Sequence, residues 1–289
     1  MRYRAVEGIL GELRCPCCRG VLSRRDGSLI CDGASGKRHC FDLAKSGYVN
    51  LDIGHAGGGD GKELVRARTA FLEGGAYDGI SDAVNELLLK YAPEGLIVDA
   101  GCGEGYYTDR AAKAIPSARF LGIDLSKLAV EAAAKRSFGT GSSAAFLVGG
   151  IFDLPIRDGA ASAVINLFAP CAEEEFSRVL RDGGILIVVG AGEDHLFGLK
   201  RAIYDVPYKN EPRADLPTSM ALIDSRRVTY SARLSSGEMI RNLFSMTPYA
   251  FRTSREDMEK LNALECLETE VDVQIFVYRC GGSSGSVNQ

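Results

Sequence analysis

The residues with the clearest chemical potential lie in the stretch DAGCGEGYYT, residues 99–108. An apolar segment runs into Asp99, and Gly101, Gly103 and Gly105 follow at intervals of two residues. Glycines at such a place let the backbone turn sharply and approach a ligand closely, while a following helix offers its N-terminal amides. The pattern predicts a ligand-binding turn between a strand and a helix. A glycine-rich turn without a ligand is the alternative.

The spacing of this motif narrows the class of ligand. Dinucleotide-binding proteins use G-x-G-x-x-G at this place. The order D-x-G-x-G-x-G seen here is instead typical of enzymes that bind S-adenosylmethionine (SAM), which has a cationic sulfonium and an amino-acid tail but no pyrophosphate. A nicotinamide dehydrogenase is excluded by the same spacing.

Two further acidic residues extend this prediction. A second strand and helix are expected over residues 119–136, and Asp124 at the end of that strand is placed to accept hydrogen bonds from both ribose hydroxyls. Capping of the helix is the alternative role for Asp124, although Ser126 already supplies a capping hydroxyl. Asp153, after the third strand, is the candidate for binding the adenine amino group, with capping of a loop as its alternative.

A cysteine cluster near the N-terminus predicts a metal site. Five of the nine cysteines fall between positions 15 and 40. A pair of thiolates facing a second pair of ligands across a hairpin fits tetrahedral zinc, and four protein ligands predict a structural site. Reactive thiols without a metal are the alternative. The candidate ligands are Cys15, Cys18, Cys31 and one of the neighbours His39 and Cys40, which are expected to point in different directions.

The remaining sequence predicts the elements that position these residues. Strands are expected near residues 96–100, 119–124, 144–150, 161–169, 184–191, 226–235 and 268–280, with helices at 62–92, 173–180 and around 237–246. Strands that alternate with helices imply an α/β fold with a mostly parallel, seven-stranded sheet, the Rossmann-like fold of SAM-dependent methyltransferases, behind a small N-terminal zinc-binding β module. Residues 192–225 fit neither a strand nor one long helix, and we expect them to shape the substrate site.

Length and charge suggest how the 289 residues are divided. We expect a zinc-binding module (1–52), a flexible linker (53–63), a SAM-dependent methyltransferase domain (64–280) and a disordered tail (281–289). The net charge is −4, yet residues 1–70 hold twelve Lys and Arg against eight Asp and Glu. A basic module on an acidic body is compatible with phosphate contacts, with a solvated face as the alternative.

Zinc and SAM are expected in different modules, so loss of zinc is predicted to leave SAM binding largely intact.

The chain resembles the ribosomal large-subunit RNA guanine-N1 methyltransferases, the RlmA family, over nearly its whole length. The resemblance rests on CPxC, FDLAKSGYVNL (41–51), RARTAFLEGGAY (66–77), DAGCGEGYYT, NLFAPC (166–171), Asp-His-Leu (194–196) and MTPYAFR (246–252). It implies methyl transfer from SAM to N1 of a guanine in a hairpin of 23S ribosomal RNA, by a homodimer in which the zinc module (1–52) serves RNA recognition together with the SAM-binding domain. Because the longest apolar runs are only strand-sized, a cytoplasmic protein without a membrane segment is expected. It further implies that His39 is the fourth zinc ligand, and that Tyr77, Tyr107, Thr108 and His195 contact the cofactor.

The catalytic residue is not predicted by these patterns. Guanine N1 carries a proton at neutral pH, so a general base or an oriented water must remove it. His195 is the titratable candidate, although the resemblance places it at the cofactor. NLFAPC departs from the N-P-P-Y motif of exocyclic-amine methyltransferases, which leaves the role of Asn166 open. Two other functions are weighed: a SAM-dependent methyltransferase of a small metabolite, and a non-catalytic zinc RNA-binding protein.

Overall fold

The computed structural model describes residues 3–33, 35–54 and 59–281. Residues 55–58 of the expected linker, and all of the expected tail except Gly281, lie outside the described residues. The strands are β1 (Leu22–Arg25), β2 (Ser28–Cys31), β3 (Cys40–Asp42), β4 (Val49–Asn50), β5 (Gly95–Ala100), β6 (Ala118–Asp124), β7 (Ala145–Val148), β8 (Ala161–Leu167), β9 (Leu180–Ala191), β10 (Ala221–Leu234) and β11 (Leu267–Arg279). The helices are α1 (Arg4–Glu7), the 3-10 turn η1 (Leu10–Glu12), α2 (Lys62–Glu73), α3 (Asp78–Tyr91), α4 (Tyr106–Ala114), α5 (Lys127–Thr140), α6 (Glu173–Val179), α7 (Phe197–Ile203), α8 (Gly237–Ser245) and α9 (Arg255–Asn262).

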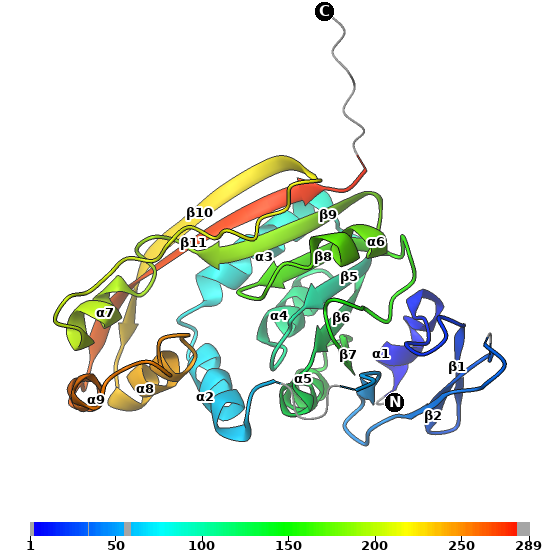
Figure 1. The fold of residues 1–289 in the computed structure, drawn as a ribbon, viewed down its shortest axis with the longest axis horizontal. Coiled ribbons are helices and arrows are strands. Elements are labelled where there is room, and N and C mark those ends of the chain that lie inside the picture. Colours follow the sequence, from blue (N-terminus) through cyan, green and yellow to red (C-terminus); the bar gives the residue numbers. More distant parts are fainter. Residues whose placement is uncertain (1–2, 34, 55–58, 282–289) are drawn as a thin grey trace, which may run out of the picture.

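One large sheet organises the chain (Figure 1). Its order is β10-β11-β9-β8-β5-β6-β7-β4, and β1, β2 and β3 form a separate sheet of three strands. All neighbours from β9 to β4 are parallel, while β11 lies antiparallel to both β9 and β10. The predicted α/β fold, with a mostly parallel Rossmann-like sheet and a separate small N-terminal β module, is thereby confirmed.

The strand count differs from the prediction by one. The additional strand is β4, in which Val49 pairs with Leu147 of β7. Two residues are too short for a recognisable alternation of apolar and polar positions, so the sequence carries no signal for it. The N-terminal module therefore ends in the edge strand of the large sheet.

The two faces of the large sheet are covered differently. Ile97 of β5 belongs to an apolar cluster that also contains residues of α2, α3, α4, α5 and α8. Its neighbours Leu96 and Val98 point to the opposite face, as successive strand residues must, and pack with α6 and with Ile9 and Leu29 of the N-terminal module. That module is therefore part of the layer that covers the second face, and shares one apolar core with the sheet.

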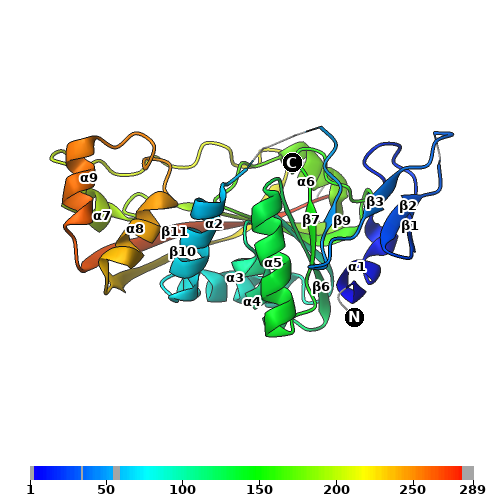
Figure 2. The ribbon, with the colours of Figure 1, turned by 90° about the horizontal axis from the view of Figure 1, so that it is seen from below.

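The long strands β10 and β11 extend beyond the others, and α7, α8 and α9 gather at their far end (Figure 2). The N-terminal module lies at the opposite end of the molecule. Helices α7 and α9 were not among the predicted elements. None of the helices in the described ranges combines the length and apolar composition that a bilayer crossing requires.

Candidate active site and metal centre

The glycine motif forms the turn between β5 and α4. Gly101, Gly103 and Gly105 all have positive φ angles, which side chains disfavour. Space is equally restrictive, because a Cβ on Gly101 would lie 2.8 Å from that of Ala169, and one on Gly105 would lie 2.7 Å from that of Ala133. The motif is therefore required by both conformation and close packing.

Acidic side chains surround this turn. Asp99 is 1% exposed and its Oδ2 accepts a hydrogen bond of 2.5 Å from Thr108 Oγ1. Asp124 accepts from the backbone amides of Gly103, at 3.0 Å, and Ser126, at 2.8 Å. Burial raises the pKa of Asp99 to about 7, and it also raises the pKa of Asp124. Carboxylates shielded from water in this way favour a cation beside them.

A cavity of about 880 Å³ opens at the carboxyl ends of β5, β6 and β8. This volume lies within the range of small-molecule sites. Among the predicted cofactor residues, the cavity is lined by Tyr77, Asp99, Gly101, Gly103, Tyr107, Asp124 and His195. Thr108 is not among the lining residues, and it is connected to the cavity only through its hydrogen bond to Asp99.

An aromatic wall stands on one side of the cavity. The ring of Phe168 stacks on Tyr77, with centroids 6.4 Å apart, and on His195, with centroids 5.9 Å apart. Phe168 directly follows the last residue of β8, has a left-handed backbone conformation and is 43% exposed. Because the aromatic ring of Phe168 is partly exposed at the cavity, it can stack on a planar ligand.

His195 is held as a neutral imidazole. The backbone amide of Asp272 donates to Nδ1 at 3.2 Å, so the ring proton resides on Nε2, which donates to the Tyr77 hydroxyl at 3.0 Å. Burial lowers the pKa of His195 to about 4. Both ring nitrogens are engaged, so His195 cannot accept a proton from a ligand, whereas the Tyr77 hydroxyl retains its own hydrogen as a donor.

Two tyrosines provide a test of whether this cavity suits a polar ligand. The hydroxyl oxygens of Tyr107 and Tyr249 are buried; that of Tyr107 has no hydrogen-bond partner in the described part of the chain, and that of Tyr249 has only a weak interaction with Thr247. Both residues line the cavity. Buried polar groups are almost always paired, so these hydroxyls indicate a ligand with polar groups. Together with the acidic turn and the aromatic wall, they fit SAM.

Asn166 has a structural role. It is fully buried, and its side-chain nitrogen donates to the backbone oxygens of Ala100 and Pro170. Its side-chain oxygen accepts from Arg213 at 2.9 Å. Every polar group of the amide is thus used within the protein. Asn166 fixes the loop after β8, and its side chain is not available to bind a nucleobase of the substrate.

Asp153 does not reach the cavity. Its carboxylate binds Arg19 through two hydrogen bonds of 2.7 and 2.9 Å, and Arg14 at 3.3 Å. The prediction that Asp153 binds the adenine amino group is therefore not supported. The neighbouring residues Ile151 and Phe152 do line the cavity. The ion pairs span more than 130 positions in the chain, which sequence spacing could not reveal.

Several other residues that line the cavity were not predicted from the sequence. They include Arg68, Glu104, Phe168, Glu211, Arg213 and Tyr249. Four of these stand in motifs that carry the family resemblance: Arg68 in 66–77, Glu104 in 99–108, Phe168 in 166–171 and Tyr249 in 246–252. Glu211 and Arg213 lie in the segment 192–225, which was expected to shape a substrate site but contains no recognisable spacing.

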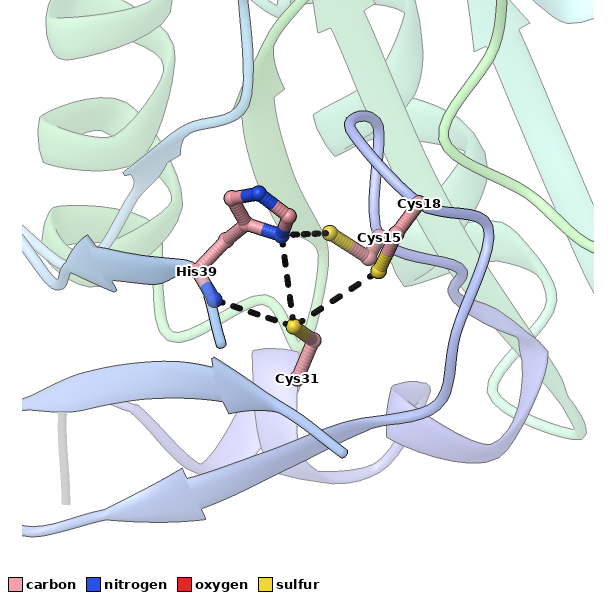
Figure 3. A group of neighbouring side chains, drawn as sticks. All are labelled: Cys15, Cys18, Cys31 and His39. Atoms are coloured by element: carbon pink, nitrogen blue, oxygen red, sulfur yellow. Dashed lines mark hydrogen bonds between the residues drawn. The ribbon is translucent and has the colours of Figure 1, made fainter. Parts of the chain in front are cut away.

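The predicted metal ligands meet in the N-terminal module (Figure 3). The side chains of Cys15, Cys18, Cys31 and His39 converge, with all four ligand atoms within 4.8 Å of one another. Cys40 is exposed and lies outside this group. The structure therefore brings His39, rather than Cys40, to the fourth position.

The distances within this group suit zinc. A tetrahedral ion with bonds of about 2.3 Å to sulfur and about 2.0–2.1 Å to nitrogen places its sulfurs about 3.8 Å apart, and sulfur about 3.5 Å from nitrogen. The Sγ atoms of Cys18 and Cys31 are 3.7 Å apart, and His39 Nδ1 lies 3.6 Å from Cys15 Sγ and 3.4 Å from Cys31 Sγ. Four protein donors leave no open position, so the centre is structural.

Comparison with known proteins gives matches to both parts of the chain. Residues 13–51 match the family model "RlmA, N-terminal", a zinc ribbon, and residues 97–184 match the model "Methyltransferase domain". The 23S rRNA (guanine(748)-N(1))-methyltransferase of Streptomyces fradiae is 37% identical over 202 residues, 68% of this chain and 69% of that protein. A Bacillus subtilis protein named "Putative 23S rRNA (guanine-N(1)-)-methyltransferase YxjB" is 32% identical over 281 residues, 91% of this chain and 95% of that protein.

Proposed function

The chain belongs to the family of 23S rRNA (guanine-N1)-methyltransferases, and from this premise we propose that it transfers a methyl group from SAM to N1 of a guanine in a hairpin of 23S rRNA. One observation carries the proposal: the similarity to the B. subtilis relative spans 91% of the chain, so it includes the zinc module as well as the methyltransferase domain. A methyltransferase of a small metabolite would leave the zinc module without a role. A decayed, non-catalytic fold would not be expected to keep the acidic turn and the cavity intact.

Different residues of the cavity bind different parts of SAM in this proposal. We propose that Asp124 accepts the ribose hydroxyls, that the turn from Gly101 to Gly105 lies beneath the amino-acid tail, and that Tyr77 and Tyr107 donate their hydroxyl hydrogens. Bound SAM supplies an electrophilic methyl group, so the protein mainly aligns the acceptor and excludes water.

The product of the reaction tests this proposal directly. The protein, SAM and 23S rRNA transcripts are incubated, and the RNA is mapped by mass and by primer extension. A methyl group on N1 blocks Watson–Crick pairing, so reverse transcription should stop next to the modified guanine. Methylation only of compounds in a small-molecule extract, with unmodified RNA, would refute the proposal.

The pKa of Asp99 leads to a prediction for cofactor binding. Because burial raises this pKa to about 7, the unliganded carboxyl is largely protonated in mildly acidic solution, whereas a bound cation favours its ionised form. SAM affinity should therefore rise with pH up to about 7, by up to roughly tenfold per pH unit, and level off above it, and below pH 7 binding should release a proton.

Calorimetry in two buffers of different ionisation enthalpy measures that proton. The variant Asp99→Asn keeps the shape of the side chain and should lose the pH dependence, which separates the titration of Asp99 from that of SAM itself. An identical pH profile in the variant would show that Asp99 does not sense the cofactor.

The N-terminal module is proposed to hold the RNA by its phosphates. In this module Arg24 is engaged internally, by an ion pair with Glu7 and by the ring of Tyr3 at 5.1 Å. Arg25 and Lys37 are exposed, and neither side chain has a partner among the described residues; the same holds for Arg38. The available charges are therefore those of Arg25, Lys37 and Arg38.

Reversal of these three charges to Glu should weaken RNA binding and flatten its salt dependence, by roughly 0.7–0.9 in the log–log slope for each phosphate that the protein no longer neutralises. SAM affinity should not change. Filter binding over a range of salt concentrations measures the slope. The control is Arg255→Glu, which alters a side chain 94% exposed at the opposite end of the molecule. If the triple variant and the control behave alike, the three charges form only a solvated face.

Three further parts of the proposal concern the protein as a whole. We propose that it acts as a homodimer and is cytoplasmic. We also retain the division into a zinc module (1–52), a linker (53–63), a methyltransferase domain (64–280) and a tail (281–289). The shared core of the first and third parts means that they are regions of one packed body.

A further inference from the structure

The cavity contains one carboxylate that the protein itself does not use. The acidic residues that line it are Asp60, Asp99, Glu104, Asp124, Glu211 and Asp215. Five of them have partners: Asp60 pairs with Arg68, Asp99 with Thr108, Glu104 with Arg136, Asp124 with two backbone amides, and Asp215 with Arg213. For Glu211, the described part of the chain offers no hydrogen bond and no ion pair.

The backbone on either side of Glu211 is nevertheless fixed. The side chain of Asn210 donates to the backbone oxygen of His195 at 2.7 Å. Two positions after Glu211, Arg213 donates to the backbone oxygen of Ala169 at 2.6 Å. The segment is thus tied both to the loop that carries His195 and to the residue next to Phe168. Glu211 is thus an exposed carboxylate at the cavity, in a segment held on one side by Asn210 and on the other by Arg213.

A carboxylate matches the edge of guanine that must be recognised. Guanine presents N–H donors at N1 and at its 2-amino group, and an ionised carboxylate has two acceptor oxygens. Adenine presents a lone pair at N1, which a carboxylate repels. We propose that Glu211 is a catalytic residue that binds this edge of the target guanine, while the base stacks on Phe168, and that it accepts the N1 proton during methyl transfer.

This inference rests on the proposed function. In the step, the N1–H electron pair forms the new bond to the methyl carbon as the bond from that carbon to sulfur breaks, and S-adenosylhomocysteine leaves. The N1 proton passes to the Glu211 carboxylate and from there to water at the open mouth of the cavity. His195 cannot replace Glu211, because both of its ring nitrogens are engaged.

Single-turnover methylation of an RNA hairpin that contains the mapped guanine tests the role. Glu211→Gln should slow methylation roughly 10²- to 10⁴-fold, the usual contribution of a general base. Its SAM affinity should match that of the wild type, because Glu211 is not assigned to the cofactor. The matched control is Glu265→Gln, which alters an exposed glutamate that does not line the cavity.

Two readouts separate proton removal from a structural effect. Without the carboxylate, only guanine already ionised at N1 reacts, so the variant's rate should rise roughly tenfold per pH unit above neutrality. A hairpin in which the target base is 8-azaguanine, whose N1 is more acidic, should partly restore the rate. Glu211→Asp, which keeps a carboxylate, should retain part of the rate and the wild-type pH profile, and it replaces the Gln variant if that variant does not fold.

These experiments distinguish failure of the role proposed for Glu211 from failure of the proposed methyltransferase function. If the wild type forms N1-methylguanine and Glu211→Gln does so at the same rate, Glu211 is not the base and the inference is wrong. A slower variant whose pH profile and response to 8-azaguanine match the wild type would also overturn it, since Glu211 would then only support the loop. If the wild type does not methylate guanine N1, the proposed function itself fails.

Discussion

Replacing Asp124 with Ala should weaken SAM binding by roughly 1.5–3 kcal/mol, about 10- to 150-fold in Kd. Asp124 stands at the end of β6, where its carboxylate lines the cavity and accepts two backbone amides. Removal leaves the ribose hydroxyls of SAM without a charged acceptor and also frees the amide of Gly103. Calorimetry measures the affinity, and thermal unfolding shows whether the variant is folded.

Two variants sharpen this experiment. Asp124→Asn keeps the shape and one acceptor oxygen, so its loss of affinity should be smaller than that of Asp124→Ala. Asp182→Ala removes an exposed carboxylate that does not line the cavity and should bind SAM normally. Wild-type affinity in a folded Asp124→Ala protein would remove Asp124 from the cofactor site.

Local patterns predicted the centre of the site well because they reflect local constraints. The turn from Gly101 to Gly105 is visible in the sequence, since only glycine suits its conformation and its contacts with Ala169 and Ala133. The cysteine spacing is equally local, because Cys15 and Cys18 lie on one knuckle and Cys31 ends the hairpin strand that faces it. In both cases the chemistry requires particular residue types at short separations.

Contacts between distant segments could not be predicted in the same way. Asp153 follows the third strand, where an acidic residue suits adenine, but Arg19 of the zinc knuckle binds it instead. Glu211 has no distinctive neighbours in the sequence, and only the anchors of Asn210 and Arg213 place it at the cavity. Such positions depend on how separate elements pack, which the order of residues does not display.

The engagement of Asp153 changes the expectation that zinc and SAM act independently. The loop 149–158 contributes Ile151 and Phe152 to the cavity wall. The same loop is fastened to the zinc knuckle by Arg19, and its Pro155 oxygen accepts a hydrogen bond of 3.0 Å from the backbone amide of Arg14. One short loop therefore touches both sites, and disorder at the knuckle removes the support for one wall of the cofactor cavity.

We therefore expect Cys18→Ser to release zinc and to weaken SAM binding as well, by about tenfold, a cost of about 1.4 kcal/mol. A structural zinc site contributes directly to folding, so its loss should also make residues 3–52 sensitive to protease. Elemental analysis should find one zinc per wild-type chain and none in the variant. Calorimetry measures the accompanying change in SAM affinity.

The variant Asp153→Asn tests whether the shared loop is the route of this coupling. It leaves all four metal ligands in place but removes the charge that binds Arg19 and Arg14. Zinc content should stay at one per chain, while SAM affinity should fall by a part of the loss seen in Cys18→Ser. If Cys18→Ser loses its zinc yet binds SAM with wild-type affinity, the two sites are independent despite the loop that joins them. If Asp153→Asn alone binds normally, the coupling runs instead through the core that Leu29 and Ile9 share with β5.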